Sequence, residues 1–154
     1  MRYYSFILIL IAFSSSSVLY SQSIYAYKLN DLNFGDIFIG YSSEVQQTDN
    51  NAAKFVFFHT KFFRGNVLVN FSLPASLKNG KYKIPVKFDS RHSAWSYRDR
   101  VDGRRNFDPY APLTLRNLRI LRPVYIWLGG TLNTFQGNAP GKYNGTIILT
   151  MEIF

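Results

Sequence analysis

The residues best suited to chemistry in this chain are arginines interleaved with aromatic side chains between residues 91 and 122. A guanidinium group binds carboxylates, sulfates and phosphates through paired N–H donors, and it also stacks on aromatic rings. Such a combination suits acidic groups carried on sugars. We therefore expect a patch for anionic ligands, formed by Arg91, Trp95, Tyr97, Arg98, Arg100, Arg104 and Arg105.

The overall charge of the chain favours an acidic partner. Eighteen Lys and Arg residues against nine Asp and Glu residues give a net charge of +9, and such a field attracts anions whatever the fold. In a cytosolic protein the same pattern would suit RNA or single-stranded DNA. For an exported chain we regard nucleic acid as an unlikely partner and expect lipopolysaccharide or an acidic polysaccharide. A solvated basic loop without a ligand is the alternative.

The remaining reactive side chains do not form a pattern typical of catalysis. The chain has no cysteine and only two histidines, His59 and His92, so we expect neither a thiolate nor a transition-metal site. Asp99, Asp102 and Asp108 have arginine neighbours and are more simply ion-pair partners than the paired carboxylates of a glycosidase. We expect no enzymatic activity, no metal and no cofactor.

The N-terminus has the order of a secretory signal peptide. Arg2 precedes an apolar run of eight residues, Phe6 to Phe13, and small polar residues follow at Ser14 to Ser17. The run is shorter than the roughly 18 residues that span a bilayer. We expect a signal peptide over residues 1–23, secretion to the periplasm or cell surface, and no transmembrane helix in the mature chain. A buried N-terminal helix or an uncleaved anchor is the alternative.

The rest of the chain has the alternation of β-strands. Tyr82, Ile84, Val86 and Phe88 alternate with Lys81, Lys83, Pro85 and Lys87, which is the pattern of a strand with one face on the core and one in water. Apolar residues make up 47% of the chain, and no useful stretch has helical period. We expect an all-β, antiparallel β-sandwich of about seven to nine strands, forming a single domain over residues 24–154.

Local departures from this alternation predict bends and turns. Pro85 lacks an N–H, which favours an edge strand or a bulge. The phase of alternation changes near Asn117, which indicates a bulge or tight turn. Gly129-Gly130 precedes a strand and no helix, so turn geometry is a better interpretation than a phosphate cradle. We expect Tyr143 to dock its ring in the core and to bond its hydroxyl to the backbone.

Three stretches carry a family resemblance. They are Asp31 to Ile37 (DLNFGDI), Phe71 to Phe88, and an ending that combines Leu128 to Leu132 (LGGTL) with Pro140 to Thr146 (PGKYNGT) and a last strand. Together they resemble the secreted bacterial family known as domain of unknown function 4402, over residues 29 to 154. The ending is also similar to those of spore coat protein U and chaperone–usher pilin domains. The resemblance implies an immunoglobulin-like sandwich outside the cytoplasm, with no assigned activity.

The last strand, Thr146 to Phe154, motivates a function. Its residues Ile147, Leu149, Met151 and Ile153 share one face, and a final strand that no element follows invites pairing with another chain. We expect a pilin- or coat-like subunit that self-assembles or joins partner subunits by strand addition, with Ser23 to Leu29 as a candidate donor. If that segment covers the edge within its own chain, the domain is complete. The alternative function is a monomeric module that binds anionic surface glycans and supports adhesion.

Overall fold

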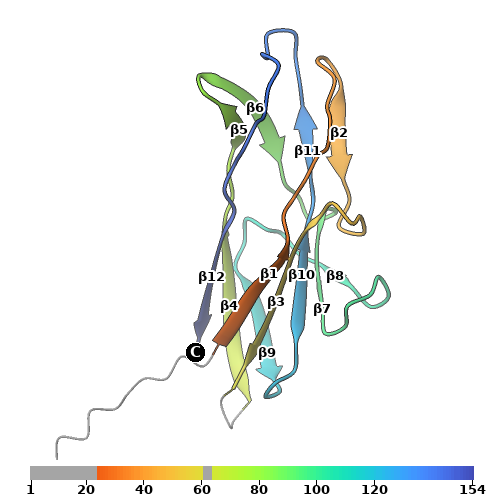
Figure 1. Ribbon diagram of the computed structural model, residues 1–154. Coiled ribbons are helices and arrows are strands. Elements are labelled where there is room, and N and C mark those ends of the chain that lie inside the picture. Colours follow the sequence, from red (N-terminus) through yellow and green to blue (C-terminus); the bar gives the residue numbers. More distant parts are fainter. Residues whose placement is uncertain (1–23, 61–63) are drawn as a thin grey trace, which may run out of the picture.

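The computed structural model describes residues 24–60 and 64–154 (Figure 1). Over these ranges the chain is all-β, with twelve strands in three antiparallel sheets and no helix. The antiparallel β-sandwich expected from the alternation is therefore confirmed. The expected signal peptide, residues 1–23, lies outside the described residues. In the described ranges no helix is long and apolar enough to cross a membrane.

One layer of the sandwich is a five-stranded sheet, and a four-stranded sheet continues it beyond the end of its central strand (Figure 1). The five-stranded sheet has the order β1 (Ile24–Asn30), β3 (Ala53–His59), β10 (Val124–Leu128), β7 (Ser93–Ser96), β8 (Arg105–Asn106). The four-stranded sheet has the order β2 (Ser42–Val45), β11 (Gly130–Asn133), β6 (Tyr82–Lys87), β5 (Ser76–Asn79). Only Gly129 separates β10 from β11, so the two sheets are continuous there.

The second layer is a three-stranded sheet. Its order is β12 (Ile148–Ile153), β4 (Gly65–Ser72), β9 (Leu113–Leu118). Every second residue of the central strand faces inward, and Val67 and Val69 are fully buried. They pack with Phe57 and Ile126 of the opposite layer in one apolar cluster. Burial of this cluster is the main force holding the two layers together.

The strand number exceeds the expected seven to nine because tertiary contacts interrupt long strands. At Gly129, a Cβ atom would collide with the backbone carbonyl of Val45, so only glycine fits where the run of strand is broken between β10 and β11. Pro74 lies between β4 and β5, and there the chain leaves one sheet for another. The break at Gly129 divides one apolar stretch, residues 124–132, into two short strands, and β5 is a further short strand between Pro74 and β6.

Most of the predicted bends are present. Asn117 has a positive φ of 54°, and the pairing of β4 with β9 shifts register beside it. The hydroxyl of Tyr143 donates to the carbonyl of Ala139 at 2.8 Å. The prediction of an edge strand at Pro85 is wrong, because β6 lies between β5 and β11. Only Val86 and Lys87 of β6 pair with β11, so the proline interrupts no pairing on that side.

Candidate functional site

The outer edge of β12 is unpaired within the described part of the chain. β12 hydrogen-bonds only with β4, from Ile148 opposite Ser72 to Ile153 opposite Val67. The strand lies on the outer flank of the sandwich (Figure 1). An uncovered strand edge presents a row of N–H and C=O groups to which another strand can bind.

The direction of these backbone groups follows from one hydrogen bond. The N–H of Phe154 donates to the carbonyl of Asn66 in β4 at 3.1 Å. Backbone groups alternate in direction along an antiparallel strand, so those of the even-numbered residues of β12 face β4. The N–H and C=O groups of Leu149, Met151 and Ile153 therefore face the open edge.

The predicted apolar face of this strand is present. Ile147, Leu149, Met151 and Ile153 are half-buried and pack against the core. The opposite face carries the strongly exposed Ile148, at 55%. Half-burial of the inward face means that the core is incompletely covered along this flank.

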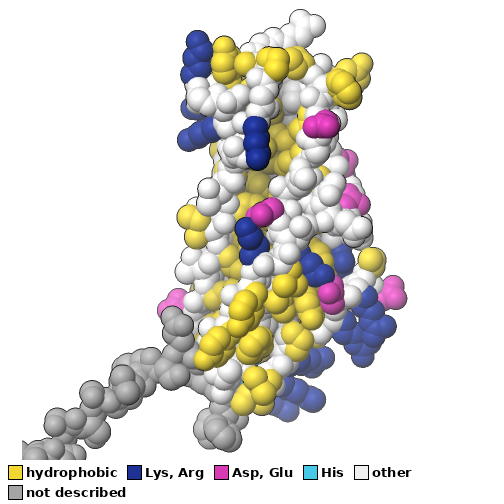
Figure 2. Space-filling view, viewed as in Figure 1, with side chains coloured by type: hydrophobic (Ala, Val, Ile, Leu, Met, Phe, Trp, Pro, Cys, Tyr) yellow, Lys and Arg dark blue, Asp and Glu magenta, His cyan; other side chains and the backbone are white. Residues whose placement is uncertain are grey.

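A groove of about 1240 Å³ opens on the same flank. Its walls are residues 31–37, which follow β1, and residues 138–147, which precede β12; core side chains such as Phe55, Ile84 and Leu132 form its floor. Figure 2 shows hydrophobic side chains at the bottom of this hollow. Small-molecule pockets usually enclose about 300–1,000 Å³, so an extended peptide segment suits the groove better than a small ligand does.

The candidate donor segment already belongs to its own sheet. β1 pairs with β3 from Ile24 opposite His59 to Asn30 opposite Lys54, and it makes no pair with β12. Tyr25 and Tyr27 are 42% and 53% exposed, on the outer surface. The N-terminal segment thus covers the edge of β3 and leaves the edge of β12 open.

The predicted arginine and aromatic patch is divided by the fold. Trp95, Tyr97, Arg98 and Arg105 line one pocket of about 210 Å³, and Arg122 from the β9–β10 connection joins them. Trp95 lies opposite Ile126 in the pairing of β7 with β10, so its ring is on the core-facing side of the sheet. The pocket therefore opens at the β7–β8 end of that layer.

Aromatic rings hold two of the pocket's guanidinium groups. The guanidinium of Arg122 lies 4.0 Å from the ring centroid of Tyr97, and that of Arg105 lies 5.3 Å from the ring of Trp95. The two rings meet edge to face at 5.3 Å. Among the described residues, neither these two arginines nor Arg98 has a carboxylate within ion-pair distance.

The other predicted arginines lie elsewhere. Arg104 stacks 3.8 Å over Trp127, on the outer face of the sheet, and donates to the side chain of Gln47 at 2.7 Å and the carbonyl of Arg100 at 3.1 Å. Burial lowers the pKa of Arg104, and the charge of nearby Asp99 opposes this. Arg104 therefore fixes the loop before β8, while Arg100 is exposed.

Arg91 is separated from the pocket. Its side chain is 84% exposed and lies 3.8 Å from the Asp89 carboxylate, in the turn before β7. Arg122, which was outside the predicted patch, takes part instead. The sequence signal for it was its place at the end of the same arginine-rich region. Of the seven predicted residues, four therefore line one pocket, and the other three, all arginines, lie outside it.

Comparison with known proteins assigns neither site. No protein-family model matches the chain, and no curated protein shows significant similarity to it. The resemblance to the domain of unknown function 4402 family stays a prediction. The function of the open edge and of the arginine pocket has to be inferred from their geometry.

Proposed function

We propose that the protein is a non-enzymatic structural subunit, pilin- or coat-like, which acts outside the cytoplasm and assembles by adding a strand of a second copy to β12. The observation that carries the proposal is the unpaired outer edge of β12, whose apolar face is half-buried beside an open groove. Export is supported by the sequence of residues 1–23, with its short apolar run after Arg2.

Strand addition would both pair the free backbone groups of β12 and cover its apolar side chains. A new strand would pair with the backbone groups of Leu149, Met151 and Ile153, and it would cover their half-buried side chains. Each Å² of apolar surface removed from water contributes about 25 cal/mol. Main-chain pairing with side chains entering at alternate positions is an established mode of peptide recognition.

A second copy of β12 can pair with this edge in an antiparallel register that is symmetric about Met151. With the two-fold axis at Met151, Leu149 faces Ile153 of the second copy, and all of these residues have backbone groups that point outward. Glu152 then faces Thr150, so no like charges oppose each other. Such a self-complementary contact is the usual interface of symmetric dimers.

The same register also covers exposed apolar side chains. Ile148 and Phe154, 55% and 63% exposed, face each other across the two strands. Ile147 lines the groove and directly precedes β12, so the edge that the second copy would cover begins where the groove ends. The edge and the groove thus form one continuous surface for the second copy.

The test compares two charges at one exposed position. Thr150→Glu would place a carboxylate opposite Glu152 of the second copy, whereas Thr150→Lys would place an ammonium group there. Cross-strand charge pairs contribute about 0.2–1 kcal/mol each, and the symmetry repeats the contact. We expect the Lys variant to dimerise about tenfold more tightly than the Glu variant, measured by sedimentation equilibrium.

The control is the same pair of substitutions at the other edge of the sheet. Thr114 is exposed on β9, and Thr114→Glu and Thr114→Lys should leave the dissociation constant of the dimer unchanged. Equal dissociation constants for the two Thr150 variants, or equal effects at Thr114, would contradict pairing through β12. A protein that stays monomeric at all concentrations would also overturn the proposal.

A further inference from the structure

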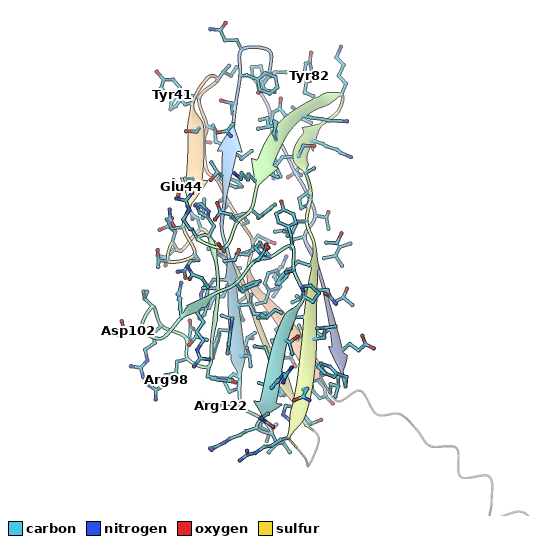
Figure 3. The ribbon with its side chains drawn as sticks, turned by 180° about the vertical axis from the view of Figure 1, so that it is seen from behind. Tyr41, Glu44, Tyr82, Arg98, Asp102 and Arg122 are labelled. Carbon is cyan, nitrogen blue, oxygen red and sulfur yellow. The ribbon has the colours of Figure 1, made fainter. Side chains whose placement is uncertain are left out.

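We infer that the pocket formed by Trp95, Tyr97, Arg98, Arg105 and Arg122 binds one acidic sugar unit, that is, a saccharide ring bearing a carboxylate or a sulfate. The site goes beyond the proposed assembly function and is independent of it. Arg98 and Asp102 lie on the flank opposite β12 (Figure 3). A ligand there would not compete with a strand added at the β12 edge.

The first argument concerns uncompensated charge. Among the described residues, Arg98, Arg105 and Arg122 line one pocket of about 210 Å³ without a carboxylate within 4.0 Å of any of their side-chain nitrogens. By contrast, Lys54 and Arg91 each have an aspartate within that distance. Three cations held in one concave space favour an anion over water as their partner.

The second argument concerns the orientation of the guanidinium groups. Arg122 stacks on Tyr97 and Arg105 lies over Trp95, and both rings are half-buried against the core. Stacking uses the flat face of a guanidinium and leaves its in-plane N–H donors free. The donors are thus held in place before a ligand arrives, which reduces the entropy lost on binding.

The third argument concerns the size of the pocket and the one carboxylate in its lining. Its volume of about 210 Å³ corresponds to about seven water molecules at ~30 Å³ each, more than a bare sulfate or phosphate ion needs. The exposed carboxylate of Asp102 also lines it. A carboxylate accepts hydrogen bonds from sugar hydroxyls and repels an inorganic anion. Three cations with one carboxylate therefore suit a ring that carries both hydroxyls and an acid.

The experiment is a titration of the purified full chain, followed by the NMR signal of the Trp95 indole N–H. The probes are methyl glucuronide, glucose 6-sulfate, neutral methyl glucoside, sodium sulfate and single-stranded DNA. We expect saturable shifts with one or both of the acidic sugars and none with the neutral sugar. The relative affinities of the two acidic sugars identify which acid group the pocket prefers.

Matched variants show whether the pocket or the overall charge is responsible. Arg122→Gln removes a stacked donor, while Arg116→Gln removes the same charge from an exposed position of β9 outside the pocket. We expect Arg122→Gln to weaken binding of the acidic sugar at least about tenfold, since a hydrogen bond to a charged group contributes about 1.5–3 kcal/mol. Arg116→Gln should leave the affinity unchanged. Asp102→Asn should weaken the sugar and strengthen free sulfate.

Four results would overturn the inference. They are no saturable shift with either acidic sugar, equal binding of the neutral sugar, equal losses in Arg122→Gln and Arg116→Gln, and tighter binding of DNA through the same arginines. None of them bears on the β12 edge, because the Thr150 variants do not touch this pocket. Unchanged thermal unfolding of the variants establishes that they fold.

Discussion

Nε2 of the His92 imidazole lies 2.6 Å from Oε1 of Glu44, although the two residues are 48 positions apart. Nδ1 of the same ring lies 2.7 Å from Oδ1 of Asp89, and the ring is only 2% exposed. Both nitrogens of this buried ring therefore have hydrogen-bond partners. The contact ties β2 to the turn before β7 and so links the four-stranded sheet to the five-stranded one.

This cluster predicts a loss of stability in acid. Burial acts to raise the pKa of Asp89, but hydrogen bonds from the His92 side chain and from the N–H groups of Arg91 and His92 hold it below its ordinary value. Because the pKa is lower in the folded protein than in the unfolded chain, the ionised carboxylate stabilises the fold at a pH above the unfolded-state pKa. This stability is lost as the pH falls through the folded-state pKa.

We therefore expect Asp89→Asn to lower the free energy of unfolding at neutral pH and to reduce its decline in acid. Urea unfolding at neutral pH and below about pH 4 measures both quantities. An Asn variant that loses as much stability on acidification as the native protein would contradict this role for Asp89.

Substitution of Gly129 should damage the junction of β10 and β11. A Cβ atom there would meet the Val45 carbonyl and lie 3.1 Å from the carbonyl carbon of Gln46. Forcing such contacts usually costs about 1–3 kcal/mol, so we expect Gly129→Ala to unfold at clearly lower urea concentration. Gly137→Ala is the control, because its nearest neighbour atom is 3.9 Å away, in Phe135. Equal midpoints for the two variants would show that the junction can adjust.

Proline can block the open edge without breaking the sheet. The N–H of Met151 faces outward, so Met151→Pro removes a donor that β4 does not use, and proline is tolerated on edge strands in that orientation. We expect this variant to remain folded but monomeric in sedimentation. Met151→Ala controls for the lost side chain and should still associate. Thr150→Pro, which removes a donor facing β4, should lower the melting temperature instead.

Two synthetic peptides should differ in their effect on the protein. A peptide of residues 147–154 reproduces β12 and should raise the melting temperature while it displaces the second copy. A peptide of residues 22–30 should do neither, because the chain's own β1 already occupies the edge of β3. Thermal unfolding with each peptide distinguishes them. Stabilisation by the 22–30 peptide alone would instead support exchange of β1 between copies.

The sequence predicted the fold best where one face of a strand packs on the core. The alternation in residues 82–88 appears as β6, and the apolar face of Ile147, Leu149, Met151 and Ile153 is present in β12. The two glycines indicated the break at Gly129-Gly130, but the reason why glycine is needed there, a close approach of Val45 from far away in the sequence, was not predictable.

The arginine patch shows a different limit. Arg104 and Arg105 are neighbours in the chain, yet they lie on opposite faces of the sheet. Arg104 stacks on Trp127 on the outer face, and Arg105 lies over Trp95 on the core-facing side. The partner of Arg104, Gln47, is 57 positions away, and no local pattern indicates it. Sequence spacing therefore predicted the composition of the pocket only in part.

Amide hydrogen exchange in β12, followed by NMR at several protein concentrations, tests strand addition most directly. The amides of Thr150 and Glu152 face β4 and should exchange slowly at every concentration. Those of Leu149, Met151 and Ile153 face the open edge, so we expect them to exchange rapidly in dilute protein and to become protected as the protein associates. Association that leaves these three amides exchanging rapidly would contradict pairing through β12.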